Sequence, residues 1–243
     1  MAKTGGLGDD LYVAGFHIGG DIQSLTANGG PNNQLDVTDI TQSAHARLGG
    51  QRTGAIKVVA YHDPALGAAH AAFAPLPTSD QIITYLRGQT LGGPAASCNA
   101  KELNYDATRA ADGMLTFATD EESNGFGLEW GIQLTADPRT DASATTGAFF
   151  DLGAAGPGFG AQAYLHLVSL GSGSVDVVIQ HATTSGGSYT TLIDFGAQSV
   201  APVAVRGTAA GAVNEFLKVT TTGVFTNAVF FVQFCLNPVA VVF

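Results

Sequence analysis

The feature that most constrains this fold is the alternation of apolar and polar residues in short runs separated by glycine-rich turns. The clearest case lies in residues 92–135, where a polar loop and a turn at Asp112-Gly113 are followed by two alternating runs. In the second run the apolar positions 128, 130, 132 and 134 share one face, and Glu129, Gly131 and Gln133 share the other. The segment predicts a β-hairpin and carries no pattern of catalytic residues.

The remaining sequence repeats this signal, so we expect an all-β chain with one or two short helices. Strand-like runs follow one another at roughly 8–12-residue spacing, which favours β-sandwiches. We predict strands over 11–22, 35–38, 55–61, 82–86, 103–105, 114–118, 128–134, 164–170, 175–180, 189–195, 216–219 and 228–236. Residues 228–236 are apolar on both faces, which indicates a central strand or one covered by a partner.

Two segments predict short helical structure. Asp63-Pro64 offers an N-cap and a first-turn proline, and an alanine-rich run follows as far as residue 73. Residues 43–48 are compatible with one helical turn, ended by Gly49-Gly50. Both helices are short, so neither changes the expected fold class.

A shift in composition near residues 137–160, rich in glycine, alanine, threonine and proline, marks a boundary. We therefore predict a first β-sandwich domain over 1–140, a linker over 141–160 and a second β-sandwich domain over 161–243. Up to residue 141 the chain has 16 acidic and 8 basic residues, and beyond it only 4 and 2. The second domain is therefore almost neutral.

Charge limits the possible partners. The formal net charge is -10, so the chain has no excess of cations to neutralise phosphates and is a poor DNA binder. Acidity is nevertheless compatible with the lining of a channel that must let DNA slide. Charged residues make up only 12% of the chain, and a weakly charged surface favours association.

The sequence offers no convincing chemical site, so we expect no enzyme activity, no cofactor and no metal. The six histidines lack metal-ligand spacing, and no phosphate-binding loop or nucleophile elbow is present. The acidic run 120–122 is expected to be a solvated hairpin loop. Cys98 is expected in a loop and Cys235 buried in an apolar strand. No apolar run reaches ~18 residues, so we expect no membrane anchor and no secretion signal.

Five stretches in serial order resemble the major tail proteins, or tail tube proteins, of long non-contractile-tailed bacteriophages, especially those that infect actinobacteria. The match covers nearly the whole chain, although no single motif is diagnostic. The stretches are LYVAGFHIGGDIQSL at 11–25, LDVTDITQSAHARLGGQRTGAIKV at 35–58, LPTSDQIITYLRGQTLGGPAAS at 76–97, KELNYDATRAADGMLTF with GFGLEWGIQLT within 101–135, and QAYLHL with the sandwich of 162–243.

The resemblance implies a structural virion protein of the tail, assembled in the host bacterial cytoplasm. Copies would join, six to a ring, and the rings would stack into a tube that DNA traverses without specific binding. A tape-measure protein and tail-tip or tail-terminator proteins would be partners. By the family pattern, residues 34–54 and the loop around 90–100 would contact neighbouring subunits, and the apolar tail is expected to dock onto its own domain or a neighbouring subunit. The candidates are Gln34, Asp36, Arg47, Arg52, Gln89, Leu91, Pro94 and Phe243.

Two other functional classes stay open at this point. The second sandwich is compatible with a carbohydrate-binding or virion-decorating module, for which Tyr164, Tyr189 and Asn214 are the candidate sugar contacts. A glycosidase would need paired carboxylates, which the near-neutral second domain makes unfavourable. A self-assembling ring without glycan turnover would separate the structural role from both.

Overall fold

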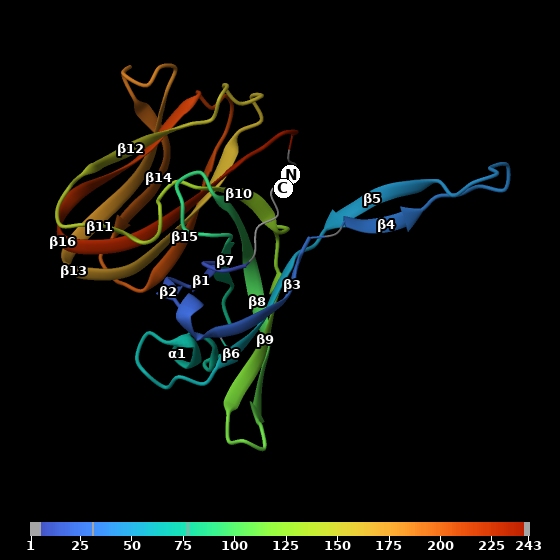
Figure 1. Ribbon diagram of the computed structural model, residues 1–243. Helices are drawn as coiled ribbons and strands as arrows, with labels where there is room; N and C mark the ends of the chain where they lie inside the picture. Colours follow the sequence, from blue (N-terminus) through green and yellow to red (C-terminus); the bar gives the residue numbers. More distant parts are fainter. Residues whose placement is uncertain (1–5, 31, 77, 241–243) are drawn as a thin grey trace.

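The computed structural model describes residues 6–30, 32–76 and 78–240, and almost every element in them is a strand (Figure 1). The expected all-β class is confirmed. The first nine strands are β1 (Asp10–Val13), β2 (Phe16–His17), β3 (Ile22–Gly29), β4 (Asn32–Asp36), β5 (Arg47–Arg52), β6 (Ala55–Tyr61), β7 (Gln81–Leu86), β8 (Pro94–Arg109) and β9 (Leu115–Ser123). The others are β10 (Glu129–Gln133), β11 (Arg139–Asp141), β12 (Thr146–Asp151), β13 (Ala161–Ala182), β14 (Thr190–Gln198), β15 (Val203–Ala209) and β16 (Phe216–Leu236).

A first hydrophobic core lies between two layers that share the bent strand β8. The first half of β8 pairs with β7, which also pairs with β1, and its second half pairs with β9, which continues through β6 to β3. Inward side chains of both layers, such as Val13, Ile56 and Phe117, form the core. Apolar residues at every second position of each strand explain why these segments bury one face.

In the described ranges, helical structure is confined to the 3-10 turn η1 (Gly19–Asp21) and the helix α1 (Ala69–Phe73), which buries Phe73 in the first core. The predicted start at Asp63 is wrong, because the Asp63 carboxylate instead accepts the Ala65 N–H at 2.9 Å in a local turn. The first backbone N–H of α1, that of Ala69, donates to the Asp21 carboxylate at 2.8 Å. No helix among the described residues is long and apolar enough to span a bilayer.

A second core is enclosed by the two longest strands. β13 and β16, of 22 and 21 residues, pair antiparallel from Ala161 opposite Leu236 to Ala182 opposite Phe216. Gly173 and Gly223, with φ of 83° and 99°, lie where the ribbon passes from one layer to the other. The predicted strands 164–170 and 175–180 are therefore joined in β13, and the predicted strands 216–219 and 228–236 are joined in β16. The expectation for 228–236 is confirmed, since β16 lies there between β13 and the pair β10 and β11.

The two cores are connected through one continuous sheet with the order β14-β13-β16-β10-β8-β7-β1-β2. β10 pairs with β8 on one side and with β16 on the other. Buried members of the first core fall between residues 11 and 117, and those of the second between 134 and 234. The division into domains 1–140 and 161–243 stays a prediction, and much of the expected linker forms β12, which pairs with β16.

Two local predictions are wrong. Residues 43–48 do not form a helical turn, because β5 begins at Arg47 and the Val37 N–H donates across a hairpin to the Ala46 carbonyl at 2.9 Å. Residues 94–100 are not a loop, because they form the first half of β8 between β7 and β10. Cys98 is consequently buried there. Cys235 is buried as expected, and both thiols are free.

Candidate subunit interface

One hairpin stands apart from both cores. It comprises β4, β5 and their connection, residues 32–52, and is called the arm below. β4 and β5 form a two-stranded sheet of their own and extend away from the body of the molecule (Figure 1). Every residue of β4 is exposed, as is every residue of β5 except the half-buried Gly50. Within the described residues, no further layer of the chain packs on the arm.

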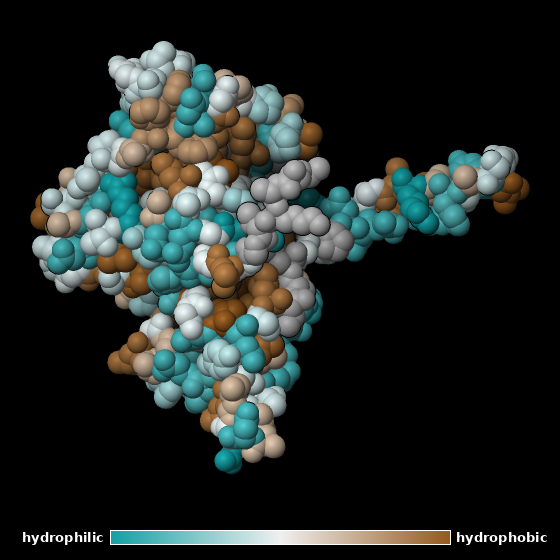
Figure 2. Space-filling view, in the orientation of Figure 1, coloured by the Kyte–Doolittle hydropathy of each residue, from teal (hydrophilic) through white to brown (hydrophobic). Residues whose placement is uncertain are grey.

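The two faces of the arm differ in chemistry. Leu35 lies directly opposite Leu48, and the two side chains are 53% and 57% exposed. On the other face, Gln34 shares a side with the cross-strand pair of Asp36 and Arg47. Figure 2 shows apolar patches among polar side chains along the arm and at its end. An exposed ribbon with an apolar and a polar face is suited to lie against a second surface.

The end of the arm is ordered by its own polar side chains. The Asp36 carboxylate accepts the Thr38 N–H at 2.9 Å, and His45 Nδ1 lies 3.0 Å from the same group. Asp39 accepts the Thr41 N–H at 2.8 Å. Hydrogen bonds from the threonine hydroxyls, then from the backbone N–H groups, lower the pKa of both aspartates. These local turns fix the conformation of the tip without contributing a core.

The root of the arm is held by close backbone contact. A Cβ atom on Gly54 would lie 2.4 Å from the Leu128 backbone nitrogen, and one on Gly30 would lie 2.9 Å from the Leu128 Cβ. Only glycine therefore allows the two arm strands to leave the body at this point. Arg52, the last residue of β5, is directed at the body and lies 3.5 Å from the Glu129 carboxylate.

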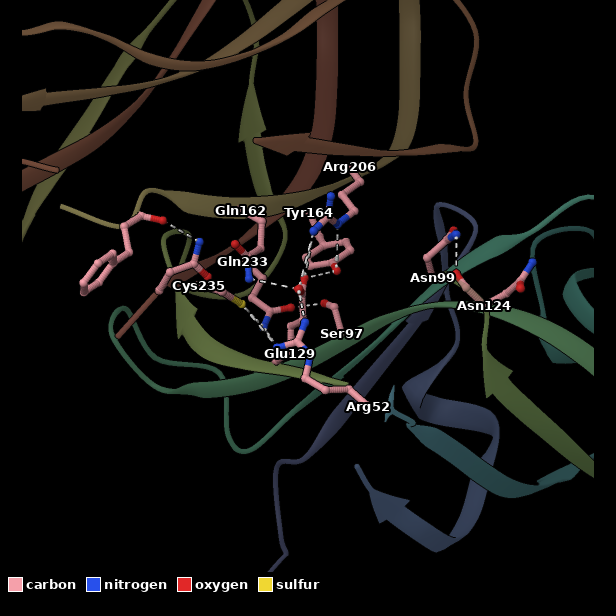
Figure 3. A network of polar contacts seen from close by, with 12 residues as sticks. Arg52, Ser97, Asn99, Asn124, Glu129, Gln162, Tyr164, Arg206, Gln233 and Cys235 are labelled. Carbon is pink, nitrogen blue, oxygen red and sulfur yellow. Dashed lines mark hydrogen bonds and ion pairs between the residues drawn. The ribbon is translucent and has the colours of Figure 1, made fainter. Parts of the chain in front are cut away.

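Glu129 is the centre of a buried polar network that joins the root to both cores (Figure 3). It is 4% exposed. Gln162 donates to it at 2.9 Å, the Tyr164 hydroxyl also donates to it, and Arg206 lies 3.4 Å away. A buried carboxylate is tolerated only where such partners replace water. The network thus gives the root a defined position relative to β13 and β15.

The structure separates the predicted contact residues into two groups. Gln34, Asp36, Arg47 and Arg52 all lie on the arm. Gln89, Leu91 and Pro94 lie instead around the connection between β7 and β8, where Gln89 donates to the Asp10 carboxylate at 2.9 Å and Pro94 pairs with Ile132. Phe243 lies outside the described residues. The part played by each in contacts between copies stays a prediction.

Other candidate sites are limited. Among the described residues, one group of possible metal ligands converges, formed by Asp10, His17 and Asp137. The proposed sugar contact Tyr164 is wrong, because its side chain is fully buried and bonded to Glu129. Tyr189 is half-buried, and the Lys218 ammonium lies 3.8 Å from the centre of its ring. The sequence had no means of showing the Glu129 network, whose members Arg52 and Arg206 lie 154 residues apart along the chain.

No protein-family description and no curated protein matches this chain. Among solved structures, a chain from the tail of an empty GTA particle with C6 symmetry is similar to this protein. The match covers 52% of this chain and 97% of that chain, with 17% identity and a TM-score of 0.40. The SPP1 Dit protein, described as a hub adsorption apparatus in phages that infect Gram-positive hosts, covers 94% of this chain and 99% of its own at 7% identity and a TM-score of 0.33. A chain of the phage p2 baseplate, in its activated conformation with Sr, covers 95% and 99% at 9% identity and a TM-score of 0.31.

Proposed function

We propose that this protein is a structural subunit of a bacteriophage tail and that the arm of each copy lies on a neighbouring copy. The observation that carries the proposal is the arm itself. A two-stranded hairpin is only marginally stable alone in water. Here it also exposes the opposed pair Leu35 and Leu48. A surface that covers this apolar face would stabilise it, and in an assembly of identical subunits that surface is supplied by the next copy.

The finer form of the proposal follows from the sequence. The serial resemblance to tail tube proteins favours rings of six copies stacked into a tube in the virion tail. The acidic balance of residues 1–141 is compatible with a channel that repels phosphates and does not retain DNA. Tape-measure and tail-tip proteins are the further partners that this role requires.

The arm can be removed without opening the body, because β3 and β6 continue to pair as far as Gly29 opposite Ala55. We would replace residues 31–53 by Asn-Gly, which favours a tight hairpin turn between antiparallel strands. The oligomeric state would be measured by light scattering on a sizing column and by negative-stain electron microscopy. We expect rings or tubes from the natural chain, and a folded monomer from the shortened one.

A milder pair of variants tests the apolar face alone. Leu35→Ser with Leu48→Ser should reduce ring formation and leave the circular dichroism spectrum unchanged. Leu66→Ser is the matched control, since this leucine is 101% exposed and lies outside the arm. A natural chain that stays monomeric at every concentration would contradict the proposal, as would undiminished assembly of the armless variant.

A further inference from the structure

Asp10, His17 and Asp137 come together from distant parts of the chain. Their ligand atoms, two carboxylate oxygens and an imidazole nitrogen, all lie within 4.8 Å of one another. Asp10 and His17 meet because the tight turn at Ala14-Gly15, with positive φ at both residues, folds β2 back onto β1. Asp137 reaches them from the connection between β10 and β11, where its own φ is 61°. The cluster therefore bridges the first core and the start of the second.

Two buried polar atoms at this junction lack a hydrogen-bond partner among the described residues. One is Oδ1 of Asp137 itself, and the other is the hydroxyl of Tyr12. Tyr12 is fully buried, and its ring stacks on the His17 imidazole with 4.6 Å between centroids. Buried polar groups are rarely left unpaired, so these two atoms indicate a missing neighbour.

We propose that Asp10, His17 and Asp137 bind a divalent transition-metal ion of the Zn²⁺ class. Zn²⁺ binds imidazole and carboxylate ligands at about 2.0–2.2 Å in a tetrahedral arrangement, so two ligand atoms on one ion are separated by roughly 3.4 Å. His17 Nε2 and Asp10 Oδ2 lie 2.6 Å apart in a hydrogen bond, and small side-chain rotations would exchange this bond for contacts to the ion. A mixed nitrogen and oxygen set favours such an ion over Ca²⁺ or Mg²⁺, which take oxygen ligands.

The surroundings of the cluster fit a bound cation. Asp10 and Asp137 bring two negative charges, and the Asp10 carboxylate is 3% exposed. Gln89 donates to Asp10 at 2.9 Å, an outer contact of the kind that orients metal ligands. The His17 side chain is 33% exposed, which leaves a path from solvent and room for water on the ion. Such a water would supply a partner to the Tyr12 hydroxyl.

The bound ion would connect the edge of the shared sheet to the turn that leads into the second core. Because Asp137 is 120 residues or more away from both other ligands along the chain, the ion would close a long loop. An ion that binds the folded state alone raises stability by mass action. The site is independent of the arm, so its test does not depend on ring formation.

The test is isothermal titration of tag-free, EDTA-treated protein with ZnCl₂ at neutral pH. We expect one ion per chain with a dissociation constant below about 10 µM. His17→Ala and the isosteric Asp137→Asn should each weaken binding at least ~10-fold. His45→Ala is the matched control, since His45 also lies 3.0 Å from a carboxylate, that of Asp36, but belongs to no three-ligand group among the described residues.

Circular dichroism of the metal-free variants would show whether each is folded. If His17→Ala does not fold, Asp137→Asn still tests the site. Absence of Zn²⁺ binding by the natural chain would overturn the proposal. So would binding that the two ligand variants leave unchanged, or that His45→Ala weakens equally, because the ion would then sit elsewhere.

Discussion

Glu102 and Glu121 form a buried carboxyl pair in the first core, and their ionisation should destabilise the protein at high pH. The two residues are direct cross-strand partners on β8 and β9, and they are 8% and 0% exposed. None of their four carboxyl oxygens has a hydrogen-bond partner among the described residues. The prediction that residues 120–122 form a loop is therefore wrong, because all three lie in β9, and Glu121 shares a face with Phe117.

The size of the effect follows from the two pKa values. Burial, followed by the charge of Glu121, raises the pKa of Glu102 to about 8. Burial, followed by the charge of Asp120, raises the pKa of Glu121 to about 7. Because both folded-state values exceed the unfolded value, the folded chain binds more protons, and stability falls as pH rises from about 4.5 to 8. Between pH 6 and 9 the loss is roughly 2.7 kcal/mol for Glu102 and 1.4 kcal/mol for Glu121.

The assay is urea unfolding followed by circular dichroism at pH 6 and pH 9. The natural chain should lose about 4 kcal/mol of unfolding free energy between these conditions. Glu121→Gln should lose at most about 2.7 kcal/mol, because it removes one ionising group and the repulsion acting on Glu102. Glu122→Gln is the matched control, one residue along β9, since Glu122 is exposed and lies 3.5 Å from the Lys57 ammonium. Equal pH dependence in Glu121→Gln and the natural chain would refute the reasoning.

Three further changes test other parts of the structure. Glu129→Ala removes the carboxylate that Arg206 contacts in the buried network. It should lower the unfolding free energy, measured by urea titration, by roughly 3–5 kcal/mol. A loss below ~1 kcal/mol would show that the network is not needed for stability. Gly131→Ala places a Cβ atom 2.1 Å from the Phe234 carbonyl oxygen and should lower the unfolding free energy by about 1–3 kcal/mol. Gly186→Ala is the control, because open space surrounds Gly186, and it should leave the unfolding free energy nearly unchanged in the same titration. Burial lowers the pKa of His166 to about 3, so stability should fall as pH drops from about 6.5 to 3, and an acid titration of His166→Gln should lack this component.

The sequence predicts strands well where one face enters a core. Residues 55–61 were expected as a strand and form β6 with the same bounds, because their alternation matches a half-buried strand. Local pattern does not show where a strand continues through a bend. The glycines at 173 and 223 indicate turns by composition, but the structure uses them inside β13 and β16. Long-range pairing over these strands overrides the local signal.

Alternation also leaves open which face of a strand is buried. In β10 the polar residues Glu129 and Gln133 are buried, while Trp130 is 48% exposed. The reason is that β10 lies between β8 and β16 and turns its polar face to the junction between the cores, where distant partners satisfy it. For the arm, the family resemblance placed contacts in residues 34–54, but the sequence did not predict a hairpin. Its exposed leucines Leu35 and Leu48 lie opposite each other, and the local sequence pattern does not show this pairing across the hairpin.

The buried carboxyl groups of β8, β9 and β10 are arranged around the root of the arm. Glu121 lies opposite Ile56, two residues beyond the root glycine Gly54, and the Ser123 N–H donates to the Gly54 carbonyl at 2.8 Å. Glu129 reaches Arg52 from the other side. The root of the arm is therefore anchored next to buried carboxyl groups, which the first core tolerates only when they are protonated or paired. Conditions that ionise Glu102 and Glu121 should loosen this anchorage together with the core, so arm orientation and fold stability depend on the same groups.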